Sequence, residues 1–127
     1  LIEKINETLE LLNLFDMKNS YARELSGGQK KLLELGRSLM KSPKILLLDE
    51  PLAGVNPKLS EQLLEIIFNL NKNGINILMV EHNIDAVMKI SERVVVMAEG
   101  KIISDGKPDF VRSDKNVIEA YLGSSNE

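Results

Sequence analysis

The spacing of hydrophobic residues predicts two helices in the first third of the chain. From Leu1 to Asp16, apolar residues recur at helical spacing, the pattern of a helix with one buried face. A polar stretch over residues 18–24 separates this helix from a second one. The second helix is expected to end at Pro43. Its predicted apolar face consists of Leu32, Leu35, Gly36 and Leu39, with the glycine allowing another element to pack closely.

Two uninterrupted apolar runs predict strands in the middle of the chain. Residues 44–48 and 75–80 do not alternate between apolar and polar, so both faces of each strand are expected to be covered, as in a parallel sheet between helices. Between the runs, Asn56 and Pro57 form the cap and first turn of a helix that stops near Gly74. The order strand, helix, strand predicts a right-handed crossover in an α/β sheet.

The last third of the chain predicts a hairpin and short helices. Asn83 can cap a short helix that reaches about Ile90. Residues 93–98 and 101–104 flank Glu99 and Gly100, a turn pair that predicts a hairpin at an antiparallel sheet edge. Two short helices are expected at 107–111 and 116–122, and residues 124–127 are expected to be frayed.

Composition narrows the functional class. The 127 residues are 43% hydrophobic and 28% charged, with no apolar run long enough to cross a bilayer, which indicates a globular chain. Absence of cysteine excludes disulfides and thiolate metal sites, and the first residues lack the pattern of a signal peptide, so a cytoplasmic setting is expected. The formal net charge of −3 makes nucleic acid an unexpected partner.

Ionisable residues follow both predicted strands. Asp49 and Glu50 come directly after the first strand, and Glu81 and His82 after the second. Because chemistry in open α/β sheets collects beyond the carboxyl ends of the strands, these residues are candidates for a site. Taken alone, each pair is equally compatible with a strand end that meets water.

A Gly-rich helix start provides the third candidate. Ser26, Gly27, Gly28 and Gln29 stand at the amino end of the second helix. Ser26 and Gln29 have the spacing of a capping box. The free amides of a helix start favour an anion, and glycines let a phosphate approach closely. An ordinary capping box is the alternative interpretation of these residues.

In order and spacing, these motifs resemble the nucleotide-binding subunits of ATP-binding cassette (ABC) transporters. Within that family the chain looks most like the branched-chain amino acid importer branch, and the lipopolysaccharide-export branch is similar. The corresponding stretches are Leu25–Gln29 for the signature motif, Ile45–Glu50 for the Walker B strand, Leu52–Asn56 for the D-loop and His82 for the switch histidine.

The resemblance implies catalytic roles at the strand ends. Asp49 would hold Mg²⁺, usually through water, as a hard oxygen ligand suits. Glu50 would polarise the water that attacks ATP. His82 would contact the γ-phosphate and help to position that water.

The resemblance also implies contacts between subunits. Ser26, Gly27, Gly28 and Gln29 would bind the nucleotide of an opposite ATPase subunit, and Asn56, where many members have Asp, would line the dimer interface. The implied partners are a second ATPase subunit, identical or different, and transmembrane permease subunits. The implied cofactors are ATP and Mg²⁺, and the implied location is the inner face of the cell membrane, reached through the permease.

No phosphate-cradling loop of the form G-x-x-x-x-G-K-[ST] occurs in the chain. Gly100-Lys101 is preceded five positions earlier by Val95, and Gly106-Lys107 by Lys101, so neither fits. The sequence therefore predicts the carboxyl-terminal half of an ABC ATPase domain, with Leu1 as a truncation point. Residues 1–42 would be part of the helical subdomain, and 43–127 the Walker B, D-loop and switch-histidine part.

The expected fold class is α/β, a partial P-loop NTPase-type sheet with flanking helices that lacks the phosphate-loop half and has an antiparallel hairpin near the carboxyl terminus. The chain alone is expected to have no ATPase activity. Three alternatives stay open: a lipopolysaccharide-export ATPase, an ABC-type ATPase that works on chromosomes or ribosomes, and a truncated non-catalytic module that docks on a complete ATPase.

Overall fold

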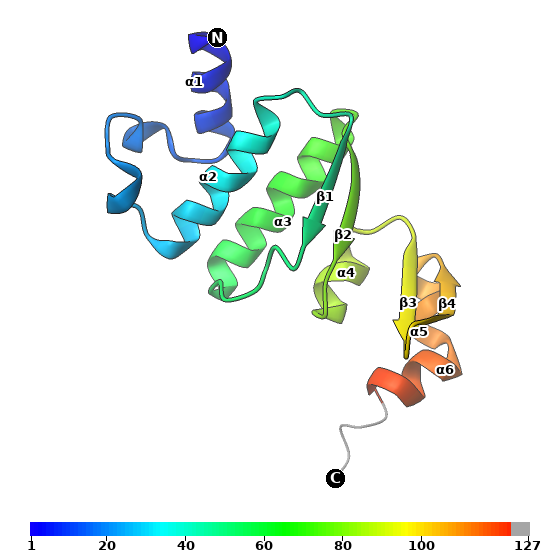
Figure 1. Ribbon diagram of the computed structural model, residues 1–127. Coiled ribbons are helices and arrows are strands. Elements are labelled where there is room, and N and C mark those ends of the chain that lie inside the picture. Colours follow the sequence, from blue (N-terminus) through cyan, green and yellow to red (C-terminus); the bar gives the residue numbers. More distant parts are fainter. Residues whose placement is uncertain (123–127) are drawn as a thin grey trace. The chain divides into compact units, whose positions relative to one another are not determined.

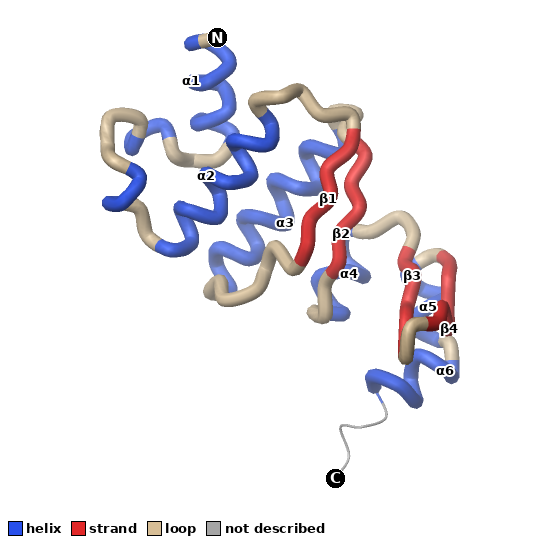
Figure 2. The backbone as a smooth tube through the Cα atoms, in the orientation of Figure 1, coloured by secondary structure: helices blue, strands red, loops and turns tan. Residues whose placement is uncertain are grey.

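The computed structural model describes residues 1–122 and has an α/β architecture (Figures 1 and 2). It divides into two compact units, with the boundary between His82 and Asn83. Within the described residues, no helix is both long and apolar enough to cross a bilayer. The first unit contains α1 (Ile2–Leu11), η1 (Phe15–Met17), η2 (Ala22–Glu24), α2 (Gly27–Leu39), β1 (Ile45–Asp49), α3 (Pro57–Lys72) and β2 (Asn76–Val80). The second contains α4 (Ile84–Ile90), β3 (Val94–Ala98), β4 (Lys101–Gly106), α5 (Pro108–Ser113), α6 (Lys115–Val117) and η3 (Ile118–Leu122).

The first unit is built on a parallel pair of strands. β1 and β2 pair in register from Ile45 opposite Asn76 to Asp49 opposite Val80, as the strand-helix-strand order predicts. The connecting helix α3 runs beside the two strands (Figure 1). Leu46 of β1 is buried on the helix-covered face. The buried side chains of α3 are Leu63, Leu64, Ile66, Ile67 and Leu70.

The other face of this sheet has no cover from the first unit, residues 1–82. Ile45, Leu47, Leu78 and Val80 alternate with the inward-facing residues and remain 57%, 71%, 60% and 57% exposed. The pairing register places Leu47 beside Leu78. The expected cover is present on the face against α3, and the opposite apolar face has none from the first unit. The continuous hydrophobic runs suit a strand buried on both sides, but here only one side has a helix against it.

Gly36 allows α1 and α2 to approach closely, as its place on the apolar face of α2 predicts. A Cβ atom built on Gly36 would lie 2.6 Å from Leu12 Cδ1 and 3.5 Å from Thr8 Cγ2. Leu12 is fully buried, so it has little room to move away. The α1–α2 contact therefore requires glycine at this position.

Gly36→Val is expected to lower the free energy of unfolding by about 1–3 kcal/mol, because the added side chain overpacks the contact with Leu12. Urea denaturation followed by circular dichroism measures this change. Arg37→Val serves as the control, since Arg37 is exposed on the same helix, directly after Gly36. Equal stability of the two variants would show that Leu12 does not confine position 36.

Three helices begin with the predicted caps. Ser26 Oγ accepts from the Gln29 N–H at 3.2 Å, and Gln29 Oε1 accepts from the Ser26 N–H at 2.9 Å, which completes a capping box. Asn56 Oδ1 accepts from the Leu59 N–H, with Pro57 in the first turn. Asn83 caps α4 in the same way. These side chains fix where α2, α3 and α4 start.

The second unit contains the predicted hairpin. β3 and β4 are antiparallel and joined by Glu99 and Gly100, both with positive φ, as a tight hairpin turn requires. They form a two-stranded antiparallel sheet, which confirms the hairpin that the sequence predicts near the carboxyl terminus. The core of the unit comprises Val94, Val111 and Val117.

Helices close the described chain. α5 takes the place of the helix predicted at 107–111. The helix predicted at 116–122 is divided into the short α6 and the π-helical turn η3. The tail that the sequence predicts to be frayed, residues 124–127, lies outside the described residues.

Arg93 and Asp105 join the two strands of the hairpin at its open end. Arg93 Nε and Nη2 donate to Asp105 Oδ1 and Oδ2 at 2.8 and 2.7 Å, a bidentate pair. Hydrogen bonding from the Arg93 guanidinium lowers the pKa of the Asp105 carboxyl below its ordinary value. The pair therefore stabilises the hairpin while Asp105 is ionised.

The hairpin is expected to lose protection in acid. Because the pKa of Asp105 is lowered in the folded state, its contribution is complete above the unfolded value of about 3.9 and disappears as the pH falls through the lowered pKa. Amide hydrogen exchange of β4 between pH 5 and 2.5 measures this effect. Asp105→Asn should flatten the pH dependence, and the exposed Asp109→Asn should not. A dependence unchanged in Asp105→Asn contradicts the assignment.

Candidate functional site

The carboxyl ends of β1 and β2 bring three of the predicted site residues together. Asp49 is the last residue of β1, and Glu50 follows it. The Glu50 N–H donates to the Val80 carbonyl at 2.8 Å, which continues the strand pairing by one residue. His82 Nδ1 lies 3.6 Å from Glu50 Oε1, and both side chains are more than half exposed. A carboxylate and an imidazole therefore share an open edge of the sheet, as predicted.

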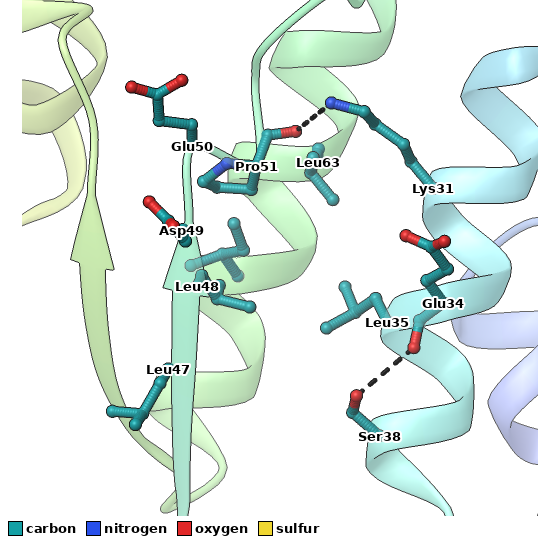
Figure 3. A pocket seen from close by; sticks show the side chains of 11 residues that line it. Lys31, Glu34, Leu35, Ser38, Leu47, Leu48, Asp49, Glu50, Pro51 and Leu63 are labelled. Carbon is teal, nitrogen blue, oxygen red and sulfur yellow. Dashed lines mark hydrogen bonds between the residues drawn. The ribbon is translucent and has the colours of Figure 1, made fainter.

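Asp49 and Glu50 also border a hollow of about 220 Å³ between α2, β1 and α3 (Figure 3). Lys31 and Glu34 contribute polar groups from α2, and Leu47, Leu48, Leu35 and Leu63 contribute apolar walls. Figure 3 shows the Glu50 carboxylate directed away from the side on which Lys31 and Glu34 lie. Glu50 is therefore accessible from the open edge of the sheet and is not enclosed in the hollow.

The Gly-rich start of α2 is a second group in the same unit. Ser26 and Gln29 are engaged in the capping box, which holds the first turn in shape. The amides of the first turn, at Gly27 and Gly28, have no partner within the helix. A Cβ atom on Gly27 would meet nothing within 4 Å, so the backbone there is open to a ligand. This geometry suits an anion.

Close packing against α3 explains why position 28 is a glycine, and the sequence alone did not reveal this contact. A Cβ atom built on Gly28 would overlap Leu59 Cδ2 of α3. The absence of a side chain at Gly28 thus allows the start of α2 to lie close to α3. The predicted close approach of a phosphate to a glycine backbone applies to Gly27, where the space is open.

Asn56 lies at the end of the loop that follows Glu50. Its side-chain oxygen accepts from the Leu59 N–H at 2.9 Å and caps α3. The amide NH₂ group of the same side chain can donate to another molecule. A role for Asn56 at an interface between subunits is therefore compatible with its role as a cap, and it stays a prediction.

The donor set at Asp49 fits magnesium. Mg²⁺ is usually held by one or two carboxylates together with waters and substrate phosphates. Asp49 is exposed and has Glu50 next to it. Among the residues that the structure describes, no group of three or more His, Cys, Asp or Glu side chains could hold a metal ion without other ligands. A cation at Asp49 would thus take further ligands from a nucleotide and water.

Two further side chains contact the loop after Glu50: Glu81, which the sequence placed among the ionisable residues at the strand ends without a role of its own, and Lys31, which it did not single out. Glu81 Oε1 accepts from the Leu52 N–H at 2.7 Å. Lys31 Nζ donates to the carbonyl oxygens of Pro51, at 3.5 Å, and Ala53. The position of Glu81 directly before His82 is a signal for the first contact, whereas no pattern in the sequence singles out Lys31.

Comparison with protein families matches two parts of the chain. Residues 2–53 match the ABC transporter family. Residues 101–126 match the family described as branched-chain amino acid ATP-binding cassette transporter. The first match contains the start of α2 and the end of β1, so it includes Ser26–Gln29, Asp49 and Glu50; His82 lies outside both matched ranges.

Relatives and a solved structure agree with these matches. A probable branched-chain amino acid transport ATP-binding protein, LivG, of Archaeoglobus fulgidus is 44% identical, covering 99% of this chain and 49% of the relative. The lipopolysaccharide export system ATP-binding protein LptB of Haemophilus influenzae is 36% identical, with 95% and 50% covered. A crystal structure of an ATP-binding cassette of an ABC transporter in its ADP conformation matches with a TM-score of 0.86 and 40% identity, covering 97% of this chain and 50% of that one. The chain spans about half the length of the curated relatives that it matches.

Proposed function

Because this chain belongs to the family of ABC transporter ATP-binding proteins, we propose that it supplies the water-activating half of an ATPase domain. In this proposal Glu50 polarises the attacking water, His82 contacts the γ-phosphate, and Asp49 helps to hold Mg²⁺. The observation that carries the proposal is the distance of 3.6 Å between His82 Nδ1 and Glu50 Oε1 at the edge of the β1–β2 sheet.

The geometry supports a division of labour at this edge. A water between Glu50 and a nucleotide would be polarised by the carboxylate, a general-base role that typically contributes about 10²- to 10⁴-fold. His82 is 73% exposed, so its ring is accessible to a phosphate at this edge of the sheet. Magnesium at Asp49, when bound, would neutralise charge on the phosphates. In this proposal Glu50 and His82 also position the water and the γ-phosphate relative to each other.

The start of α2 would act on a different nucleotide. Ser26, Gly27, Gly28 and Gln29 present an anion-binding helix start. We propose that they contact the γ-phosphate of ATP held by a second ATPase subunit, with Asn56 at the shared interface. Hydrolysis would then require two subunits. The capping box and the open space at Gly27 support this proposal of a second subunit as partner.

This chain matches about half of each relative. We propose that a polypeptide equivalent to the other half supplies the rest of the ATPase domain. No sequence G-x-x-x-x-G-K-[ST] occurs among the 127 residues. The exposed apolar face of Ile45, Leu47, Leu78 and Val80 is suited to burial against such a half. We accordingly propose that the chain alone does not hydrolyse ATP.

For the assembled protein we propose import of branched-chain amino acids. The match of residues 101–126 to a branched-chain amino acid transporter family favours amino acid import over lipopolysaccharide export, the system named for the LptB relative. Permease subunits would carry the substrate across the membrane and hold the ATPase at its cytoplasmic face. Substrate specificity would reside in those partners.

Reconstitution tests the proposal. The chain is co-expressed with the part of Archaeoglobus fulgidus LivG that it does not match, and the two are purified together as the reconstituted pair. We expect magnesium-dependent ATP hydrolysis by the pair, and none by either part alone. A purified pair that forms but binds no ATP, or binds it without hydrolysis, would overturn the catalytic assignment.

A further inference from the structure

Glu50, which precedes the loop Pro51–Ala53, has a strained backbone. Glu50 has φ of 45°, in the left-handed region that glutamate rarely adopts. Such a conformation typically costs about 1–3 kcal/mol and persists only where surrounding contacts determine it. Because Glu50 carries the carboxylate proposed as the base, whatever holds its backbone also sets the direction of that carboxylate.

The carboxylate of Glu81 holds the loop from the β2 side. Its Oε1 accepts from the Leu52 N–H at 2.7 Å, two residues beyond Glu50. Its Oε2 accepts from the N–H of His82 at 3.3 Å. One side chain therefore connects the backbone after Glu50 to the backbone of His82. Hydrogen bonds to an ionised group are shorter and stronger than neutral ones.

Lys31 holds the same loop from the opposite side. Its ammonium group donates to the carbonyl oxygens of Pro51 and Ala53 (Figure 3 draws the first). Lys31 lies in α2, near the helix start that carries Ser26 and Gly27. The loop is thus held by a cation on its carbonyl groups and by a carboxylate on its amide.

Packing and backbone bonds complete this arrangement. Leu52 is buried, with 8% of its surface exposed, so the loop is anchored at its centre. The Ala53 N–H donates to the Glu50 carbonyl at 3.0 Å and closes a tight turn. Among the hydrogen bonds of the described residues, those of the Glu81 and Lys31 side chains are the ones that join this loop to the His82 backbone and to α2.

We propose that Glu81 and Lys31 are positioning residues for ATP hydrolysis, which clamp the loop Pro51–Ala53 so that Glu50 and His82 keep a fixed separation. Lys31 joins this loop to the helix that is proposed to contact the second nucleotide. The inference rests on the proposed function for its catalytic consequence, but the clamp itself is a property of this chain. A misplacement of about 1 Å at a reacting group can cost about 100-fold in rate.

Hydrogen exchange on the 127-residue chain tests the clamp without ATP. Glu81→Ala removes the acceptor of the Leu52 N–H, and we expect exchange at this amide to accelerate at least tenfold. Glu81→Gln keeps one amide oxygen and should remain within about threefold of the original chain. Glu65→Ala, an exposed acid on α3, is the matched control and should leave this amide unchanged. Unchanged exchange in Glu81→Ala would overturn the clamp, whatever the ATPase result.

Kinetics of the reconstituted pair test the positioning role. We expect Glu81→Ala and Lys31→Met each to lower kcat about 10- to 100-fold with KM within twofold, and Glu81→Gln to recover most of kcat. Lys30→Met, beside Lys31 and exposed, should match the original pair. An unchanged kcat in an active pair would overturn the positioning role. If the original pair is itself inactive, the proposed function fails, and accelerated exchange at Leu52 still supports the clamp.

Discussion

Glu50→Gln should lower ATP turnover by the reconstituted pair about 10²- to 10⁴-fold, the contribution expected of a correctly placed general base. Glutamine has the same shape but cannot accept a proton from water, so ATP affinity is expected to change less than about threefold. Turnover is measured as phosphate release with saturating Mg²⁺ and ATP, and affinity by titration of a fluorescent ATP analogue. Both are needed, because a loss of binding would imitate a loss of catalysis.

The control for Glu50→Gln is Glu65→Gln on the exposed side of α3, which should hydrolyse ATP at the original rate. His82→Ala should also lower turnover, since it removes the ring 3.6 Å from the Glu50 carboxylate. Turnover by Glu50→Gln within threefold of the original pair would contradict the assignment of Glu50 as the base. Loss of ATP binding in this variant would instead place Glu50 among the binding residues.

The double variant Leu47→Asp, Leu78→Asp should prevent association with the complementary half. Both leucines lie on the uncovered face of the β1–β2 sheet, side by side in register. Burying each leucine is worth about 1.5–3 kcal/mol, so losing both should weaken association at least about 100-fold, and the added carboxylates weaken it further. Co-purification and size-exclusion chromatography measure the association.

Ile2→Asp provides the matched control for the sheet-face variant. Ile2 is 75% exposed on α1, away from the sheet, so a charge there should leave association intact. Circular dichroism of the chain alone should be unchanged in the double variant, because neither leucine is buried in it. Normal association of the double variant would show that the complementary half does not cover this face.

Local sequence signals predicted the elements of the chain well. The capping box of Ser26 and Gln29 and the asparagine caps at Asn56 and Asn83 mark helix starts through short-range hydrogen bonds, and all three form as expected. Gly36 was identified as a point of close packing from its place on an apolar face. Residues that act through neighbours in sequence can be recognised without knowledge of the fold.

Features that depend on distant residues were not predictable. The overlap that a side chain at Gly28 would have with Leu59 needs the placement of α2 against α3. The contact from Lys31 to the loop joins residues about twenty positions apart through tertiary structure. Leu47 is exposed although its apolar run predicts burial. Hydrophobicity shows that a strand face is suited to burial but does not identify the partner that would cover it.

ATP hydrolysis by the purified 127-residue chain tests the central claim most directly. The chain carries the carboxylate and the histidine proposed to activate water but no phosphate-cradling loop, and much of phosphoryl-transfer catalysis comes from that loop and its lysine. With saturating Mg²⁺ and ATP, phosphate release by the chain is predicted to equal that of buffer. Magnesium-dependent turnover that disappears in Glu50→Gln would contradict the claim that the domain must be completed from elsewhere.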